Sequence, residues 1–139
     1  MGPAGDSGPQ TPRAAADPQS AEGQLAFGNA CMQAGRYADA ATAYARSLAA
    51  APGNASAHNN LAVAFAEQRL FDRAIPHYRE ALRLDPGYAE AHYNLGNALR
   101  ELARYGEAVA CYDRALALRP DWPGAHCNRG LALAAQGQQ

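Results

Sequence analysis

A fixed period of 34 residues runs through most of this chain and constrains its fold more than any other feature. The motif Ala-x3-Tyr, followed by a proline, occurs three times in one register without an insertion. The three copies are Ala40, Tyr44 and Pro52; Ala74, Tyr78 and Pro86; and Ala108, Tyr112 and Pro120. A constant period of this length indicates a stack of similar units, in which each unit is stabilised by its neighbours.

Further landmarks fall into the same frame, with a pair that ends in Gly or Ala early in each unit and an aromatic residue near its middle. These landmarks are Phe27-Gly28, Leu61-Ala62, Leu95-Gly96 and Arg129-Gly130, then Tyr37, Phe71 and Tyr105. The pattern resembles the tetratricopeptide repeat over residues 21–137. The tryptophan that usually opens such a repeat is replaced by Gln24, His58, His92 and His126. The resemblance implies an all-α fold, a right-handed α-solenoid of antiparallel helix pairs.

The period divides the chain into three full repeats, at residues 21–54, 55–88 and 89–122, and a half repeat at 123–137 that forms a capping helix. We expect helices at 18–34, 37–50, 55–68, 71–84, 89–102, 105–118 and 122–136. Residues 1–17 are rich in Pro and Gly and almost free of large apolar side chains. We therefore expect a disordered leader at 1–17 and a repeat domain at 18–137.

Capping and turn residues predict where several of these helices begin and end. Asp17 stands directly before a proline, which predicts the start of the first helix. Asn54 and Asp121 are the expected caps of the third and seventh helices. Gly35 and Gly137 are the expected flexible residues at the turns that follow the first and seventh helices.

Charge and composition limit the classes of partner. The net charge is −1 and no repeat carries a basic stripe, so we expect no nucleic-acid partner. All twelve basic side chains are arginines, and with abundant Ala, Gly and Pro this composition is typical of a GC-rich, bacterial genome. No apolar run has the length of a secretory signal or a membrane span, so we expect a cytoplasmic protein that does not contact a membrane.

The chain shows no signature of catalysis or of metal binding. His58, His92 and His126 share one register, but successive copies lie on successive helices, about 8–10 Å or more apart, too far to share one zinc ion. We interpret them as packing residues, and His77 as a histidine without a partner. Neither a nucleophile elbow, a phosphate loop nor a zinc-protease motif is present. We predict that the protein is not an enzyme and has no cofactor and no metal.

Asparagine recurs on one face of the first helix of the repeats. Asn60, Asn94 and Asn128 stand at intervals of 34 residues, and Asn29 and Asn97 occupy the position three residues later in their repeats. Residues three apart share a helix face. In tetratricopeptide proteins that face lines a concave groove, and an amide can bond the main chain of an extended peptide. We predict peptide binding here; the alternative is that these asparagines cap turns or face solvent.

Two residues beside this column complete the predicted site. Tyr93 is the expected side-chain contact with the peptide, and Arg100 is the charge expected to select acidic or polar ligands. The first repeat carries Ala26 where the later repeats carry asparagine, so the column is predicted to begin in the second repeat.

Residues 91–99 resemble the asparagine ladder in the repeat arm of O-linked N-acetylglucosamine transferases, although only the arm and no glycosyltransferase domain is similar. Another tetratricopeptide mode is a clamp in which Lys and Arg grip the terminal carboxylate of a chaperone. The matching positions here are Leu25, Asn29, Asn60, Glu90 and Asn94. Every required cation is missing, and Glu90 would repel such a ligand.

We predict an interaction scaffold that holds an extended peptide segment of a partner protein along the groove. One alternative is the substrate-recognition arm of an O-linked N-acetylglucosamine transferase-like enzyme whose catalytic domain lies outside this chain. Another is a structural adaptor or self-assembling scaffold. Leu131 and Leu133 leave an apolar strip on the last helix, so self-association through that helix is a further hypothesis. Arg129 suits a helix that faces solvent.

Overall fold

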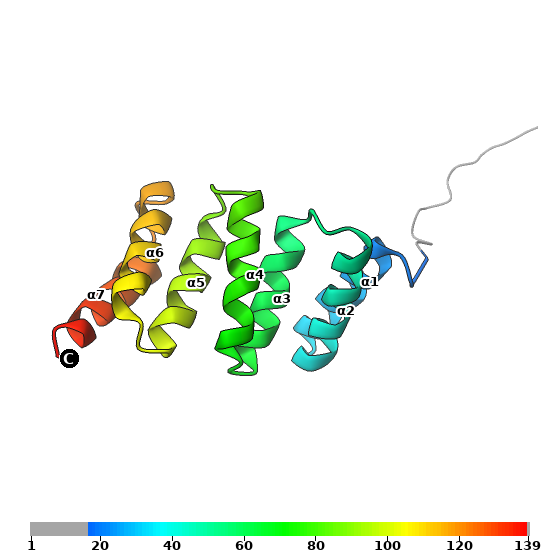
Figure 1. The fold of residues 1–139 in the computed structure, drawn as a ribbon, viewed down its shortest axis with the longest axis horizontal. Helices are drawn as coiled ribbons and strands as arrows, with labels where there is room; N and C mark the ends of the chain where they lie inside the picture. The colour runs from blue at the N-terminus through cyan, green and yellow to red at the C-terminus, as the bar shows by residue number, and fades with distance from the viewer. Residues whose placement is uncertain (1–16, 139) are drawn as a thin grey trace, which may run out of the picture.

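The computed structural model describes residues 17–138, which form three antiparallel pairs of α-helices, a seventh single helix and no strand (Figure 1). The helices are α1 (Ala21–Gln33), α2 (Tyr37–Ala50), α3 (Ala55–Glu67), α4 (Phe71–Leu84), α5 (Ala89–Glu101), α6 (Tyr105–Leu118) and α7 (Pro123–Gln136). The predicted all-α solenoid is confirmed. The expected leader at 1–17 lies outside the described residues except for Asp17. None of the seven helices is long and apolar enough to span a membrane.

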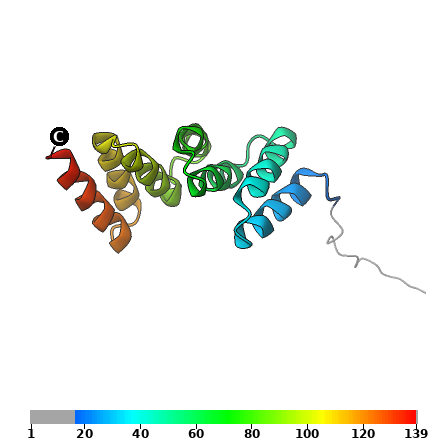
Figure 2. The same ribbon diagram turned by 90° about the horizontal axis from the view of Figure 1, so that it is seen from below.

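The helix pairs follow one another along the long axis of the molecule, and α7 closes the row (Figure 2). Helices α1, α3 and α5 each pack on the second helix of their own pair, and α3, α5 and α7 each pack on the second helix of the preceding pair. The first helices of neighbouring pairs also contact each other, α3 with α5 and α5 with α7. These first helices therefore form a common face, which carries the asparagines of the sequence.

Two predicted caps are wrong, and one is confirmed. Helix α1 begins after Ser20, whose Oγ accepts the Gly23 N–H at 3.0 Å, while Asp17 instead forms a separate turn ahead of the helix. Asn54 caps α3 by accepting the Ala57 N–H at 3.0 Å. Helix α7 begins after Trp122 and not after the expected Asp121, because the proline that follows Trp122 takes the first helical position.

The turn inside each pair requires one left-handed residue. Gly35 adopts a φ of 75°, and its counterparts 34 residues apart are Arg69 at 61° and Ala103 at 59°. Each turn is closed by a hydrogen bond across six residues, such as Arg36 N to Cys31 O at 2.8 Å. These bonds satisfy carbonyl groups at the helix end and offset the strain of a side chain at positive φ. Gly137 does not follow the prediction, because it ends α7 at a φ of −70°.

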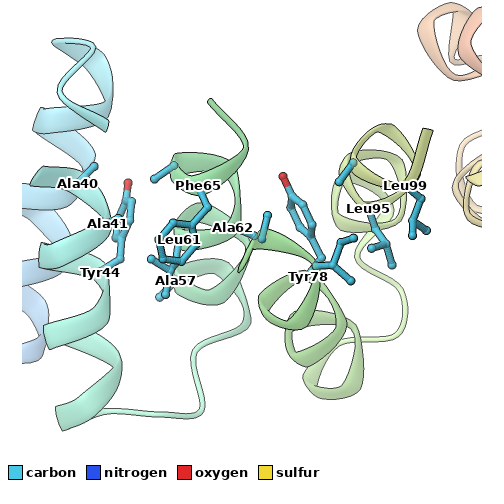
Figure 3. Close-up of a cluster of buried hydrophobic side chains, with 14 of the residues drawn as sticks. Ala40, Ala41, Tyr44, Ala57, Leu61, Ala62, Phe65, Tyr78, Leu95 and Leu99 are labelled. Carbon is cyan, nitrogen blue, oxygen red and sulfur yellow. The ribbon is translucent and has the colours of Figure 1, made fainter. Parts of the chain in front are cut away.

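Tyr44, Tyr78 and Tyr112 are the largest fully buried side chains of the described residues. Gly28 and Gly96 lie directly against two of these rings, and a Cβ added there would come within 2.7 and 2.8 Å of a ring carbon. Figure 3 shows Tyr44 and Tyr78 packed beside the helices of the following repeat, with both hydroxyl groups pointing to the same side of the view. The repeating tyrosines therefore join each repeat to the next.

The last helix leaves an apolar strip exposed, as expected. Leu131 and Leu133 are 53% and 41% exposed, whereas Leu99, at the register of Leu133 in the third repeat, is 1% exposed. The difference arises because α7 has no second helix beside it in the described chain. Arg129 does not simply face solvent, since its guanidinium pairs with Asp113 on α6.

Candidate functional site

The predicted site residues lie on the face formed by α1, α3, α5 and α7. Six of them are half-buried, and Asn29 is exposed. The half-buried residues are Asn60, Tyr93, Asn94, Asn97, Arg100 and Asn128. Side chains of this kind reach solvent while they still contact the protein, so their hydrogen-bond partners decide what remains open to a ligand.

Several of the amides hydrogen-bond to one another between repeats. The Asn94 Nδ2 donates to Asn59 Oδ1 at 3.3 Å, which joins α5 to α3. The Asn128 Nδ2 donates to Asn97 Oδ1 at 2.9 Å and to the Tyr93 hydroxyl at 3.0 Å, which joins α7 to α5. The column is therefore not a row of free amides, because part of its bonding capacity ties neighbouring repeats together.

Asn29 and Asn97 each form a hydrogen bond with a buried tyrosine. They stand at position nine of the first and third repeats, counted from residues 21 and 89. The Tyr44 hydroxyl donates to Asn29 Oδ1 at 2.6 Å, and the Tyr112 hydroxyl donates to Asn97 Oδ1 at 2.6 Å. Asn60 differs from these residues, because its side chain forms no hydrogen bond with another described residue. Asn60 is consequently the amide of the column with the most open bonding capacity.

Tyr93 is held between aromatic neighbours. Its ring centroid lies 4.5 Å from that of Trp122 and 6.0 Å from that of Tyr112. Its hydroxyl accepts the Asn128 amide, as described above. Tyr93 therefore supports the junction of the third repeat with α7, a role that the sequence register did not reveal.

Asn59 is a residue of this face that sequence reasoning missed. It is 5% exposed, and it accepts the amide of Asn94 from the next repeat. Because asparagine stands at this register only once in the chain, the 34-residue period did not single it out. The signal available in the sequence was its place directly before Asn60, on a helix that is otherwise rich in alanine.

A hollow of about 300 Å³ opens on this face between the second and third repeats. Three predicted residues line it, whereas the other four do not. The lining residues are Val63, Ala66, Glu67, Arg69, Phe71, Tyr78, Asn94, Asn97, Ala98, Arg100 and Glu101. The structure thus gathers Asn94, Asn97 and Arg100 at one place and leaves Asn29, Asn60, Tyr93 and Asn128 outside it.

Of the two arginines that line this hollow, one forms an ion pair with another described residue and the other does not. Arg69 donates to Glu101 across the hollow at 2.9 Å. Arg100 is half-buried and donates to the Tyr112 hydroxyl at 3.4 Å, and within residues 17–138 it has no carboxylate partner. A half-buried guanidinium without an ion pair retains donors for a ligand.

A larger hollow, of about 510 Å³, lies on the opposite helices, along α2 and the start of α4. Four alanines of α2 line it, and Phe65, Arg46 and Arg73 are among its other lining residues. None of the predicted site residues lines it. We place the candidate site at the smaller hollow, because three of the predicted residues, Asn94, Asn97 and Arg100, line it and none lines the larger one.

The histidines and cysteines form no site of their own. His58, His92 and His126 each contact the carbonyl oxygen of the proline six residues earlier, at 3.2, 3.0 and 2.8 Å. His77 was expected to have no partner, which is wrong, because its ring stacks on His58 with the two Nδ1 atoms 3.3 Å apart. Burial raises the pKa of the Cys111 thiol to about 11, so it is a poor nucleophile. In residues 17–138 no three His, Cys, Asp or Glu side chains are grouped to hold a metal.

Comparison with known proteins supplies the family. Models described as tetratricopeptide repeat match residues 25–89 and 77–110, and one described as TPR repeat matches residues 96–137. A comparison with curated proteins finds no match.

Solved structures with the same fold include two tetratricopeptide domains. One is that of Arabidopsis OM64, 28% identical, which covers 81% of this chain and 93% of the other with a TM-score of 0.79. Another is the first such domain of Spaghetti (RPAP3) bound to the HSP90 peptide SRMEEVD, 27% identical, which covers 87% and 96% with a TM-score of 0.83. The protein MamA is 26% identical over 88% of this chain and 71% of its own, with a TM-score of 0.84. Since the family models together span residues 25–137 and these structures share the fold, the chain is a tetratricopeptide-repeat protein.

Proposed function

We propose that this protein binds an extended peptide segment of a partner protein along the face formed by α1, α3, α5 and α7. The observation that carries the proposal is the hollow between the second and third repeats, where Asn94, Asn97 and the unpaired Arg100 converge. Similar repeat domains bind short peptides, HSP90 SRMEEVD in Spaghetti (RPAP3) and HSP70 SGPTIEEVD in the second domain of human RPAP3.

The ligand of this chain belongs to a different class from chaperone C-termini. The positions of a carboxylate clamp carry no cation, and Glu90 stands at one of them. The Glu90 carboxylate accepts from Arg119 at 2.9 Å but stays exposed, so it would still oppose an acidic peptide end. We expect recognition of an internal, extended segment, with its main chain bonded by amides and one polar side chain received at Arg100.

Peptide selection followed by calorimetry tests the proposal. Peptides with amidated C-termini are selected from a random library on the intact chain, and the best is titrated against variants. Arg100→Gln should weaken binding roughly tenfold, because it removes a charge-assisted hydrogen bond. The matched control is Arg114→Gln, which removes an exposed arginine of α6 outside the hollow. The SRMEEVD peptide should not bind.

Two outcomes of that experiment contradict the proposal. If no library peptide binds the intact chain, the chain is not a peptide-binding scaffold of this kind. If peptides bind but Arg100→Gln and Arg114→Gln leave the affinity equally unchanged, the ligand lies elsewhere. The larger hollow along α2 would then be the next surface to alter, through Arg46 and Arg73.

The two alternatives from the sequence stay predictions. The arm of an O-linked N-acetylglucosamine transferase-like enzyme requires a longer form of the protein, and a transferase assay on such a form would test it. The self-assembling scaffold receives support from the exposed Leu131 and Leu133 on α7. Sedimentation of the chain at tens of micromolar checks this, because a monomer at that concentration contradicts self-association through α7.

A further inference from the structure

The Tyr78 hydroxyl lacks the hydrogen-bond partner that its counterparts have in the first and third repeats. Those two pairs are Tyr44 with Asn29 and Tyr112 with Asn97, each at 2.6 Å. At position nine the second repeat carries Val63, which has no acceptor. Tyr78 is only 2% exposed, and its hydroxyl forms no hydrogen bond with any other described residue. A buried hydroxyl without a partner is costly, so this one calls for an explanation.

The hydroxyl of Tyr78 is directed toward the hollow between the second and third repeats. Tyr78 lines that hollow, and so does Val63. In the first and third repeats the tyrosine hydroxyl reaches the residue at position nine, so the same geometry brings the Tyr78 hydroxyl to Val63 at the wall of the hollow. Figure 3 shows the Tyr78 hydroxyl pointing to the same side of the view as that of Tyr44. Val63, Ala66 and Ala98 supply apolar walls around the same space. The hollow therefore combines a small apolar surface with one buried donor.

The charges around the hollow favour a neutral ligand group that both donates and accepts. Arg69 and Glu101 neutralise each other in an ion pair. Arg100 and Glu67, of opposite charge, have no ion pair among residues 17–138. Glu67 lines the same hollow as Tyr78. Burial, and then the Glu67 carboxylate, raise the pKa of Tyr78 above its ordinary value. A carboxylate ligand would be attracted by Arg100 but repelled by Glu67, and an ammonium ligand the reverse, so the hollow favours neither sign of charge.

We propose that this hollow binds the side-chain carboxamide of an asparagine or glutamine in an extended peptide. Its carbonyl oxygen accepts from the Tyr78 hydroxyl and the Arg100 guanidinium, and its NH2 group donates to the Glu67 carboxylate. The inference rests on the proposed function and adds the class of residue that is recognised. A main-chain amide of the peptide shares this chemistry, and the test below separates the two sources.

The experiment compares peptide preference in three forms of the intact chain. A random heptapeptide library with amidated C-termini is selected on the wild type, on Tyr78→Phe and on Val63→Asn. The wild type should recover peptides with Asn or Gln at one fixed position, and replacement of that residue by Glu, Leu or Ala should weaken binding roughly tenfold in fluorescence anisotropy. Tyr78→Phe removes the donor, and Val63→Asn supplies the internal acceptor of the other repeats. Both should abolish the preference.

Controls make the outcomes distinct. Tyr105→Phe removes a tyrosine hydroxyl outside the hollow and gives the residue that the second repeat has at Phe71, so it should keep the preference for Asn or Gln. Peptides that bind the wild type without this preference, or that keep it in Tyr78→Phe, would overturn the inference and leave the proposed function standing. In that case the partner of the Tyr78 hydroxyl is a main-chain amide of the peptide or a water molecule, and not a side-chain carboxamide. Failure of every peptide to bind overturns both.

Discussion

The second repeat and its two neighbours pack in the same way but differ in their polar contacts. All three place a tyrosine at one register, and each ring is 2% exposed or less. In the first and third repeats the ring hydroxyl ends on an asparagine of the same repeat. In the second repeat Val63 stands at the position of that asparagine, and Tyr78 lines a hollow instead.

This difference separates what packing requires from what it leaves free. The tyrosine ring fills the junction between repeats and cannot be exchanged without loss of core contacts. The residue opposite its hydroxyl is not constrained in this way, because either an internal amide or an external ligand can satisfy the donor. A repeat protein can therefore vary its binding surface at position nine while the solenoid stays the same.

The largest expected effect tests the packing that all three repeats share. Tyr78→Ala and Tyr112→Ala should each lower the free energy of unfolding by about 3–5 kcal/mol, because each removes a fully buried aromatic ring. Urea denaturation followed by circular dichroism measures both. A loss at Tyr78 well below that at Tyr112 would show that the second junction is packed less tightly than its buried ring indicates.

Removal of the tyrosine hydroxyl should affect the free energy of unfolding differently in the second repeat than in the first and third. Tyr112→Phe removes a hydrogen bond to Asn97 and should cost about 0.5–1.5 kcal/mol. Tyr44→Phe should behave similarly through Asn29. Tyr78→Phe removes a buried hydroxyl without a protein partner, so its effect on the free energy of unfolding should be near zero or stabilising. Equal losses in the three variants, measured by the same urea method, would mean that the Tyr78 hydroxyl is satisfied within the folded chain.

A double-mutant cycle sharpens the same contrast. Val63→Asn should create in the second repeat the bond seen in its neighbours, so Val63→Asn and Tyr78→Phe should couple by about 1 kcal/mol. The coupling, and not the effect of Val63→Asn alone, is the diagnostic quantity, because Val63 also contributes apolar packing. Additive effects in thermal or urea unfolding would show that the introduced amide does not reach the hydroxyl.

The 34-residue period was sufficient to predict the fold, because helix packing requires the residues that carry it. Ala40 and Ala74, at one register, are both fully buried, and a larger side chain there would overpack the helix pair. The turn between the helices of a pair was harder to read. Glycine at position 35 predicts a left-handed residue there. Arg69 and Ala103 adopt the same conformation, although neither residue type predicts it.

The candidate site was predictable only in part. Register alone placed Asn94 and Asn97 on one helix face, and the structure brings both to the hollow with Arg100. Their partners could not be read from the period. Asn59 occurs once at its register, and Tyr78 has the same identity as two tyrosines with different hydrogen bonds. What distinguishes Tyr78 is the residue opposite it, which a one-dimensional pattern does not relate to it.

The smallest expected effect concerns a second position at which the middle repeat differs. His77 stands where the first and third repeats have Ala43 and Cys111. Burial, and then the neighbouring His58 and Arg73, lower the pKa of His77 from its ordinary value near 6.5, against an opposing contribution from Glu80. The unfolded chain therefore binds the proton more readily than the folded one. The contribution of His77 to stability is present above about pH 6.5 and is lost as the pH falls below it.

Urea midpoints at pH 7.5 and 5.5 measure this dependence. The wild type should be less stable at the lower pH, and His77→Ala, which restores the residue of the first repeat, should reduce the difference. His58→Gln should reduce it by a smaller amount, because it removes one charged neighbour and leaves the burial of His77 in place. Since the rings of His58 and His77 are stacked with their Nδ1 atoms 3.3 Å apart, protonation of both would place two like charges in contact. An unchanged pH dependence in His77→Ala would mean that groups other than His77 destabilise the repeats in acid.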